Sequence, residues 1–431
     1  MRPAFYLENK SILNVKLDCP ENGNPGCGGT EFLFAALPHY LQKIHKNAVS
    51  PVLLANHIHN LPPEVESYCV NDLTSAAQKA KNLGCTHFIF RPRRDAADGF
   101  YELLDSLQLA TIAWTHVLPT NKHIRELAKC KAVKAVVCVE HEQNEAMRDT
   151  PLWSKLTYIV NGFDMEPFAQ AAPLPRDEAT IMYLGALVPV KGFHILARAW
   201  PKVLQRHPNA RLLVAGTGKV YDQDAPLGSW GLADKNYEDK EIKPFLAGPD
   251  GKTTPSVELL GKLGIEKFDY LRRVTLGVAN PSGLSENCPG AALEIQACGT
   301  PIVSGAYYGM LDTIRHNETG LLGKTVEDLA NNICTILEDK ELASRLGNNG
   351  PAFVHQRYNY NKVTQQWLHL MELIALNQRP PAAPLKSNIF SHWKWAIYLN
   401  SVLQYTLGKF MFWPTILELK HAAIALKRKI M

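Results

Sequence analysis

No stretch of this 431-residue sequence approaches the run of about 18–20 apolar residues that a membrane-spanning helix needs. The first 16 residues lack the basic start and apolar run of a secretory signal. The nine cysteines form no CxxC pair and no Cys/His cluster with zinc spacing. These absences argue against an integral membrane protein, a disulfide-stabilised secreted domain and a structural zinc protein. They predict a cytoplasmic protein with reduced thiols.

The body of the chain also lacks an excess of positive charge. The whole sequence has 46 basic and 41 acidic residues, which gives a net charge of +5. Residues 386–431 hold seven basic residues and one acidic residue, so this tail carries +6 and residues 1–385 carry 5 − 6 = −1. A nucleic-acid-binding body is expected to carry a basic face of its own. The composition therefore argues against nucleic acid as a partner and assigns the basic character to the tail.

Short apolar, β-branched runs alternate with longer helical patterns along most of the chain, and no solenoid repeat is present. This alternation is typical of parallel sheets with crossover helices, and the length favours two domains. A turn signal at Asn161-Gly162 predicts a first domain at 1–170. A second domain follows at 171–376 with a polar, irregular insertion at about 219–256, and a linker and tail at 377–431. The expected strands and helices include Val52–Ala55, His87–Phe90, Ala110–Thr115, Ala135–Val139, Leu156–Val160, Ile181–Gly185, Arg211–Ala215, Val274–Ala279 and Ile302–Ser304, and Thr30–Ile44, Phe100–Leu107 and Gly192–Gln205.

The most informative segment is Pro281–Glu294, which follows an expected strand. Ligands bind at the carboxyl ends of strands in open α/β sheets, so this loop should line a binding crevice. Pro289 suits the first residue of a helix and Gly299 the position after its end. The N–H groups at the start of this helix would favour an anion.

Glu286 and Glu294 could each bond hydroxyl groups of a sugar or a ribose. An ordinary loop carboxylate and an exposed helix carboxylate are the alternative.

This segment resembles the E-x7-E region of the glycosyl transferases group 1, a family of retaining glycosyltransferases with the GT-B fold. Each motif alone is weak, and the ordered set over about residues 155–375 is strong. The resemblance implies two Rossmann-like, doubly wound domains that face each other across a cleft, followed here by a helical tail. The other matching segments are Ile159–Asp164, Met182–Gly192, Leu213–Gly218, Ala297–Val303 and Glu318–Leu322.

The resemblance also implies roles for individual residues. Lys191 would neutralise the diphosphate of a nucleotide-sugar donor, Glu286 would hold hydroxyls of the transferred sugar, and Glu294 would hold the ribose. The backbone from Asn287 through Cys288 and Pro289 to Gly290 would touch the distal phosphate. Lys191 taken alone could equally be a surface lysine at the start of a helix.

Three further positions complete the site that the resemblance implies. Gly28 and Gly29 resemble the family's glycine-rich loop, and Gly218 belongs to its Gly-x-Gly turn. Gly29 stands where a P-loop needs lysine, which excludes an NTPase. His116 looks like the family's histidine near the reacting carbon, although a lone histidine is more often structural.

One position departs from the family pattern. Ala186 stands where the family usually has arginine, so a second cation for the diphosphate is missing from the motif. Another basic residue could substitute, donor binding could be weaker, or donor chemistry could be lost. Asp222-Gln223-Asp224 lies in the polar insertion rather than after a buried strand, so we expect no metal and no cofactor besides the donor substrate.

The tail combines aromatic residues between Phe390 and Pro414 with an apolar stripe that runs from Ile416 to Ile430 and with basic residues beside it. This pattern suits a helix in the headgroup layer of an anionic membrane. Packing across both domains, or a homodimer interface, is the alternative.

Taken together, the sequence predicts a metal-independent retaining glycosyltransferase. It would move a hexose from a UDP- or GDP-sugar to a glycan or lipid-linked acceptor, in cell-surface polysaccharide or lipopolysaccharide synthesis. Its expected location is the cytoplasm, peripheral at the inner face of the membrane. A sugar-nucleotide epimerase of the same fold and a non-catalytic partner subunit are the alternatives.

Overall fold

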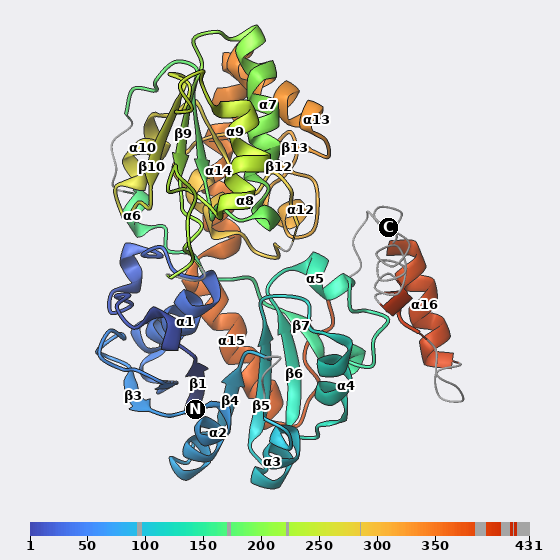
Figure 1. Cartoon of the computed structure of the whole chain (residues 1–431). Helices are drawn as coiled ribbons and strands as arrows, with labels where there is room; N and C mark the ends of the chain where they lie inside the picture. Colours follow the sequence, from blue (N-terminus) through green and yellow to red (C-terminus); the bar gives the residue numbers. More distant parts are fainter. Residues whose placement is uncertain are drawn as a thin grey trace.

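The computed structural model describes residues 1–92, 97–169, 174–220, 224–284, 286–383, 394–406, 414–416 and 418–419. Within them the chain forms two α/β domains, one above the other in Figure 1. The first domain has a seven-stranded sheet in the order β3-β2-β1-β4-β5-β6-β7, and the second a six-stranded sheet in the order β10-β9-β8-β11-β12-β13. In both sheets the neighbouring strands of the described residues pair in parallel.

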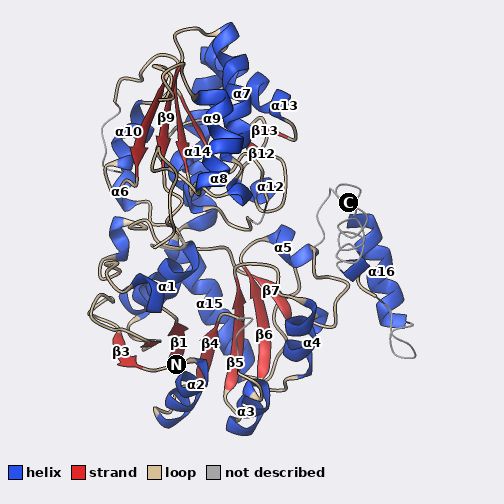
Figure 2. Cartoon of the chain, in the orientation of Figure 1, coloured by secondary structure: helices blue, strands red, loops and turns tan. Residues whose placement is uncertain are grey.

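Helices cover both faces of the first sheet (Figure 2). Buried side chains of α2, α3 and α4 pack on one face, and those of α1 pack on the other. The strands are β1 (Pro3–Leu7), β2 (Val52–Ala55), β3 (Glu66–Cys69), β4 (His87–Phe90), β5 (Ala110–Thr115), β6 (Val133–Cys138) and β7 (Leu156–Tyr158). The helices are α1 (Gly29–His45), α2 (Leu73–Asn82), α3 (Phe100–Leu107), α4 (Asn121–Lys129) and α5 (His141–Glu145), and α6 (Glu166–Ala169) leads toward the second domain.

The second domain repeats this architecture on a smaller sheet. Helices α7 and α13 pack on one face, and α10 and α11 pack on the other. The strands are β8 (Thr180–Leu184), β9 (Arg211–Ala215), β10 (Val257–Gly261), β11 (Leu276–Val278), β12 (Ile302–Gly305) and β13 (Gly320–Gly323). The helices are α7 (Phe193–Arg206), α8 (Lys235–Tyr237), α9 (Lys243–Leu246), α10 (Lys267–Arg273), α11 (Gly290–Ala297), α12 (Met310–Thr313), α13 (Val326–Glu338) and α14 (Lys340–Tyr358).

Most expected elements agree with the structure to within two residues. The helix expected to begin at Pro289 begins one residue later, at Gly290, because Pro289 has an extended backbone (ψ 109°) and acts as the N-cap of α11. Gly299 follows the end of α11 with φ +69°, the left-handed conformation expected for that position.

The prediction of a polar, irregular insertion at about 219–256 is wrong in part. This segment contains α8, a π-helical turn at Glu238–Ile242 and α9. Ile242 and Leu246 are fully buried in the second core. Its helices have three to five residues each, which is too short for the 3.6-residue period to emerge from a polar background.

The chain crosses between the domains twice, and the two crossings lie side by side. The Phe163 N–H on the outward crossing donates to the Tyr358 carbonyl on the return crossing at 2.7 Å. A Cβ atom on Gly162 would lie 2.0 Å from the Tyr360 ring, so a glycine is required for this close approach. The predicted turn at Asn161-Gly162 therefore sits where the two crossings pack against each other.

After the return crossing, helix α15 (Tyr360–Ala375) packs on the first domain. Trp367 is fully buried, with ring centroids 5.1 Å from Trp114 and 6.5 Å from Phe5. The predicted boundaries at 170 and 376 stay predictions. The structure adds that a helix within the range 171–376 completes the core of the first domain.

Beyond α15 the structure describes one more helix, α16 (Lys394–Thr406), which lies beside α5 and α4 (Figure 1). Most of the predicted apolar stripe at 416–430 lies outside the described residues. No helix within the described ranges is long and apolar enough to cross a membrane.

We expect Trp367→Ala to lower the free energy of unfolding of the first domain by about 3–5 kcal/mol, because it leaves a large cavity between α15 and the sheet. The exposed Gln365 of the same helix offers a control, and Gln365→Ala should change little. The measurement is the thermal unfolding temperature of both variants. Equal melting temperatures would contradict the assignment of α15 to this core.

Candidate functional site

A cleft of about 230 Å³ lies between the two domains. The loop before α1 reaches it from the first domain. The loops after β8, β9, β10 and β11, together with the start of α11, line it from the second domain. Ligands bind at this edge of open parallel sheets, so this cleft is the candidate site. The predicted site residues among its lining are Gly29, Lys191, Glu286, Cys288, Pro289, Gly290 and Glu294.

One charged pair in the cleft joins two predicted residues. The Lys191 ammonium group forms an ion pair with the Glu286 carboxylate, and both side chains are mostly buried, with 14% and 18% of their area exposed. Asn280, after β11, donates its amide N–H to Glu286 Oε2 at 3.1 Å. Folding thus brings together two residues that the sequence separates by 95 positions.

The backbone around this pair is close-packed. Gly192 has φ +71°, and a Cβ atom there would lie 2.5 Å from the Ser282 nitrogen. The Ser282 hydroxyl donates to the Val190 carbonyl at 2.6 Å. The glycine after Lys191 therefore lets the loop after β11 rest on the turn that carries the lysine.

A second charged pair includes a residue that the sequence analysis missed. The Lys267 ammonium group donates to Glu294 Oε1 at 2.7 Å, and these side chains are 7% and 10% exposed. The same ammonium group donates to the Asn24 carbonyl of the first domain at 3.3 Å. Lys267 lies in none of the segments that carry the family resemblance. Its position at the start of α10, after β10, was the available signal.

The structure also shows which cations lie near Ala186. Ala186 is buried and lines the cleft, and Lys262 and Lys267 line the same cleft from the segment after β10. A Cβ atom on Gly26 would lie 2.4 Å from Lys262 Cε, so this lysine side chain rests on the first-domain loop. Two lysines besides Lys191 thus line the cleft in which Ala186 replaces the family's arginine.

The glycine-rich loop is held in shape by Asn24. Its side-chain oxygen accepts from the N–H groups of Gly26 at 2.8 Å and Cys27 at 2.9 Å. Gly28 is the N-cap of α1, and a Cβ atom there would lie 2.1 Å from Glu31 Oε2. Gly29 borders open space, so it is the glycine of this pair that meets the cleft.

Four predicted residues are not among those that line the cleft, namely Gly28, His116, Gly218 and Asn287. Gly218 donates its N–H to the Leu232 carbonyl at 2.7 Å, which leaves Gly216 as the lining glycine of the Gly-x-Gly turn. Asn287 is buried, and its side-chain amide donates to the His116 carbonyl at 2.7 Å, across the domain interface. The Gly218 N–H and the Asn287 side-chain amide are thus both hydrogen-bonded to other parts of the protein.

His116 also lies beside the cleft rather than in its lining. Its ring packs 4.5 Å from that of Trp114 and 5.8 Å from that of Phe34. Neither ring nitrogen has a hydrogen-bond partner within the described part of the chain. Burial, together with the nearby Arg91, lowers the pKa of His116 to about 3, so the ring is neutral at ordinary pH.

A buried polar cluster joins the domains next to the crossings. Glu140, after β6, accepts from the Arg357 guanidinium at 2.6 Å and from the Tyr358 hydroxyl at 2.7 Å. Asp312 lies 3.9 Å from the same guanidinium and accepts from the Glu142 N–H at 2.7 Å. Burial raises the pKa of Glu140 to about 7, and Arg357 opposes this shift. This cluster is structural, since it lies among groups that hold the domains together.

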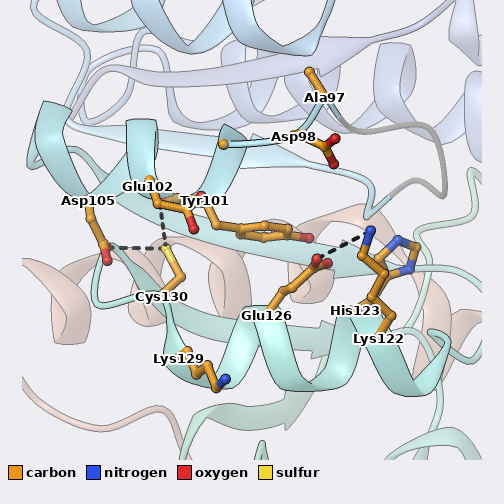
Figure 3. Close-up of a pocket in the computed structure, with 11 residues that line it drawn as sticks. Ala97, Asp98, Tyr101, Glu102, Asp105, Lys122, His123, Glu126, Lys129 and Cys130 are labelled. Carbon is orange, nitrogen blue, oxygen red and sulfur yellow. Dashed lines mark hydrogen bonds and ion pairs between the residues drawn. The ribbon is translucent and has the colours of Figure 1, made fainter.

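A larger hollow of about 430 Å³ lies between α3 and α4 of the first domain (Figure 3). Several of its polar groups contact protein partners. The Cys130 thiol lies 3.2 Å from Asp105, which also accepts from the Ala132 N–H, and Lys122 pairs with Glu126 at 3.7 Å. None of the predicted site residues lines it, so the interdomain cleft remains the candidate site.

We expect His116→Phe to make the protein less sensitive to acid. The folded-state pKa of His116 lies below its ordinary value of 6.5, so the unfolded chain binds a proton that the folded chain does not. The contribution of His116 to stability is therefore unchanged above pH 6.5 and falls by about 1.4 kcal/mol per pH unit from there toward pH 3. Melting temperatures at pH 7.5 and 5.0 should show a smaller acid loss in this variant than in the wild type or the exposed-site variant His369→Phe. An equal loss would contradict the buried, neutral ring.

Residues 164–353 match the family described as glycosyl transferases group 1. An uncharacterized glycosyltransferase of Methanocaldococcus jannaschii is 28% identical over 272 residues, which cover 59% of this chain and 62% of that protein. The phosphatidyl-myo-inositol mannosyltransferase of Mycobacterium tuberculosis is 28% identical over 235 residues, which cover 52% and 56%. These matches span less than two thirds of the relatives' own length.

Solved structures extend the similarity to most of the chain. A glycosyltransferase from Rickettsia africae superposes with a TM-score of 0.66 at 14% identity, covering 88% of this chain and 99% of that one. Sucrose-phosphate synthase from Thermosynechococcus elongatus gives 0.64 at 17% identity, covering 88% and 100%. Anabaena HepE in complex with UDP gives 0.60 at 16% identity, covering 86% and 100%.

At these identities the structures establish the fold, and the prediction of two facing Rossmann-like domains is confirmed. The matched stretch contains Lys191, Lys267, Glu286 and Glu294, the four residues of the two charged pairs. Residues 164–353 of this chain, which has the GT-B fold, therefore match the family glycosyl transferases group 1.

Proposed function

We propose that this protein is a retaining glycosyltransferase that moves a hexose from a UDP- or GDP-sugar to a glycan or lipid-linked acceptor. The observation that carries this proposal is the pairing of Lys191 with Glu286 at the carboxyl ends of the strands, inside the stretch that matches the family. A relative named for phosphatidyl-myo-inositol and a structural neighbour in complex with UDP support these substrate classes. Cell-surface polysaccharide or lipopolysaccharide synthesis would use such a product.

The charged groups suit departure of a diphosphate. As the bond between the anomeric carbon and the diphosphate oxygen breaks, negative charge grows on that oxygen. The Lys191 ammonium group and the N–H groups at the start of α11 would stabilise this charge. Transfer of Lys191 from Glu286 to the diphosphate would free the carboxylate to accept hydrogen bonds from sugar hydroxyls.

In a retaining reaction of this kind, the acceptor oxygen attacks the anomeric carbon on the face from which the diphosphate leaves, and the proton of the acceptor hydroxyl passes to the departing diphosphate oxygen. The chain's contribution is then positioning and charge stabilisation rather than a strong base. A neutral His116 fits this scheme, because it offers no acid or base of suitable pKa near neutrality.

The lysines after β10 supply the positive charge that Ala186 does not. In this proposal Lys267 orients Glu294 toward the donor ribose and adds a cation to the donor site. Its contact with the Asn24 carbonyl would couple that role to the glycine-rich loop of the first domain.

We expect one nucleotide sugar from a panel of UDP, GDP, ADP and their sugars to raise the melting temperature selectively. A ligand at about 100 times its dissociation constant adds about 2.7 kcal/mol of stability. Glu286→Gln should lose the additional stabilisation by the sugar and keep that by the nucleotide alone, because Glu286 is assigned to the sugar. The exposed Glu341 offers a matched control, Glu341→Gln.

Other outcomes of this panel, together with analysis of the products, separate the alternatives. Stabilisation by none of these compounds would favour the non-catalytic partner subunit. Conversion of the sugar nucleotide without an acceptor would favour the epimerase. With an acceptor, the anomeric configuration of the product measured by NMR should equal that of the donor, and an inverted product would contradict a retaining enzyme.

We expect Lys267→Met to weaken binding of the nucleotide at least about ten-fold, while Lys240→Met on the outer surface leaves it unchanged. Isothermal titration of Lys267→Met, Glu294→Gln and the double variant separates two roles. If Lys267 acts only by orienting Glu294, the double variant loses no more affinity than Glu294→Gln alone. If Lys267→Met binds the nucleotide as tightly as the wild type, the assignment of Lys267 to the donor site is wrong.

A further inference from the structure

Helix α16 presents a row of apolar side chains to solvent. Trp395, Leu399 and Val402 are 46%, 57% and 59% exposed. Their spacing of four and three residues places them on one face of the helix. Isolated exposed apolar residues are ordinary, whereas an aligned row of large ones marks a contact surface. We call these three residues of α16 the apolar stripe from here on; they are distinct from the apolar repeat that the sequence shows at 416–430.

Polar contacts attach another side of α16 to the first domain. The buried Lys394 ammonium group pairs with Glu142 at 2.5 Å, and the Asn400 amide donates to Asp149 Oδ2 at 2.6 Å. The Tyr398 hydroxyl bonds Glu145. An amphipathic helix normally turns its apolar side toward the core. Here buried polar groups fix the helix, and the apolar stripe is left exposed. The helix itself lies at the edge of the molecule (Figure 1).

The chain around α16 is strongly basic. Residues 386–431 contain seven basic residues and one acidic residue, Glu418. The Glu418 carboxylate pairs with Arg125 of α4 at 2.6 Å. Most of these basic residues lie outside the described part of the chain. The sequence places their positive charges before and after the helix. An anionic surface attracts such a segment.

We propose that α16 binds the surface of an anionic lipid bilayer, with the apolar stripe inserted at the boundary between headgroups and acyl chains. Trp395 suits this boundary, because indole has a large apolar body and a polar N–H. Apolar insertion and electrostatic attraction together supply the two signals that stable membrane binding needs. This interaction is independent of the sugar donor, so it stands apart from the proposed function.

A second copy of the chain suits this surface less well. A stable protein interface buries about 800 Å² on each partner, more than a row of three side chains provides. Two tails of charge +6 would also repel each other. An anionic membrane removes that repulsion and accepts a narrow apolar row.

The test is co-sedimentation of the full chain with vesicles of phosphatidylcholine, with and without 30 mol% phosphatidylglycerol. The variant Trp395→Gln/Leu399→Gln/Val402→Gln removes the apolar stripe and keeps residues that favour helix. A matched control changes three exposed apolar residues elsewhere, as Leu13→Gln/Ile265→Gln/Leu376→Gln. Melting temperature verifies that each variant is folded, and light scattering reports the oligomeric state.

We expect the wild type and the control to bind anionic vesicles and the stripe variant to bind at least ten-fold more weakly. Binding of the wild type should also weaken with added salt and on vesicles without phosphatidylglycerol. A wild type that stays in the supernatant, or a stripe variant that binds as well as the wild type, would overturn the proposal. A wild-type dimer that becomes a monomer in the stripe variant would assign the surface to a second copy instead.

Discussion

The parallel direction of both sheets is the constraint on which the rest of this structure depends. Strands that run in one direction end at one edge, so the loops that follow them gather there. The two crossings of the chain, which pass each other at Phe163 and Tyr358, bring the carboxyl edges of the two sheets to a shared cleft. Residues as distant in sequence as Asn24, Lys191 and Glu286 line it together. Side chains on these loops can vary while the sheets below keep their places.

Four charged side chains that line the cleft form two ion pairs. Lys191 with Glu286 and Lys267 with Glu294 are mostly buried, and each charge would be costly there without its partner. Such pairs are weak sources of stability, because desolvation offsets much of their attraction. They are well suited to exchange partners with an anionic, hydroxyl-rich ligand that offers equivalent contacts. The contact of Lys267 with Asn24 adds a link between ligand-facing charge and the relative position of the domains.

Polar contacts also attach the C-terminal region, in contrast to the apolar packing of α15. Trp367 of α15 enters the first core, whereas α16 is attached through Lys394 and Asn400 and leaves Trp395 exposed. In the part of the tail that the structure describes, α16 therefore has polar contacts on its inner side and an apolar stripe on its outer side. The sequence analysis treated membrane binding of the tail and packing of the tail on the domains as alternatives. It did not predict that one helix would have both a polar contact with the first domain and an exposed apolar side.

The sequence by itself determined the α/β class, most strands and the cleft segment around Glu286, because these depend on local periodicity, caps and an ordered set of motifs. Gly299 illustrates this, since its left-handed conformation follows from its place after a helix. Tertiary structure alone decided that Lys267 joins Glu294, that Gly216 rather than Gly218 lines the cleft, and that His116 is buried between aromatic rings. Each of these outcomes rests on contacts between segments far apart in the chain. Local patterns carry no information about such contacts, because burial and hydrogen-bond partners are set only when the sheets and crossings are in place.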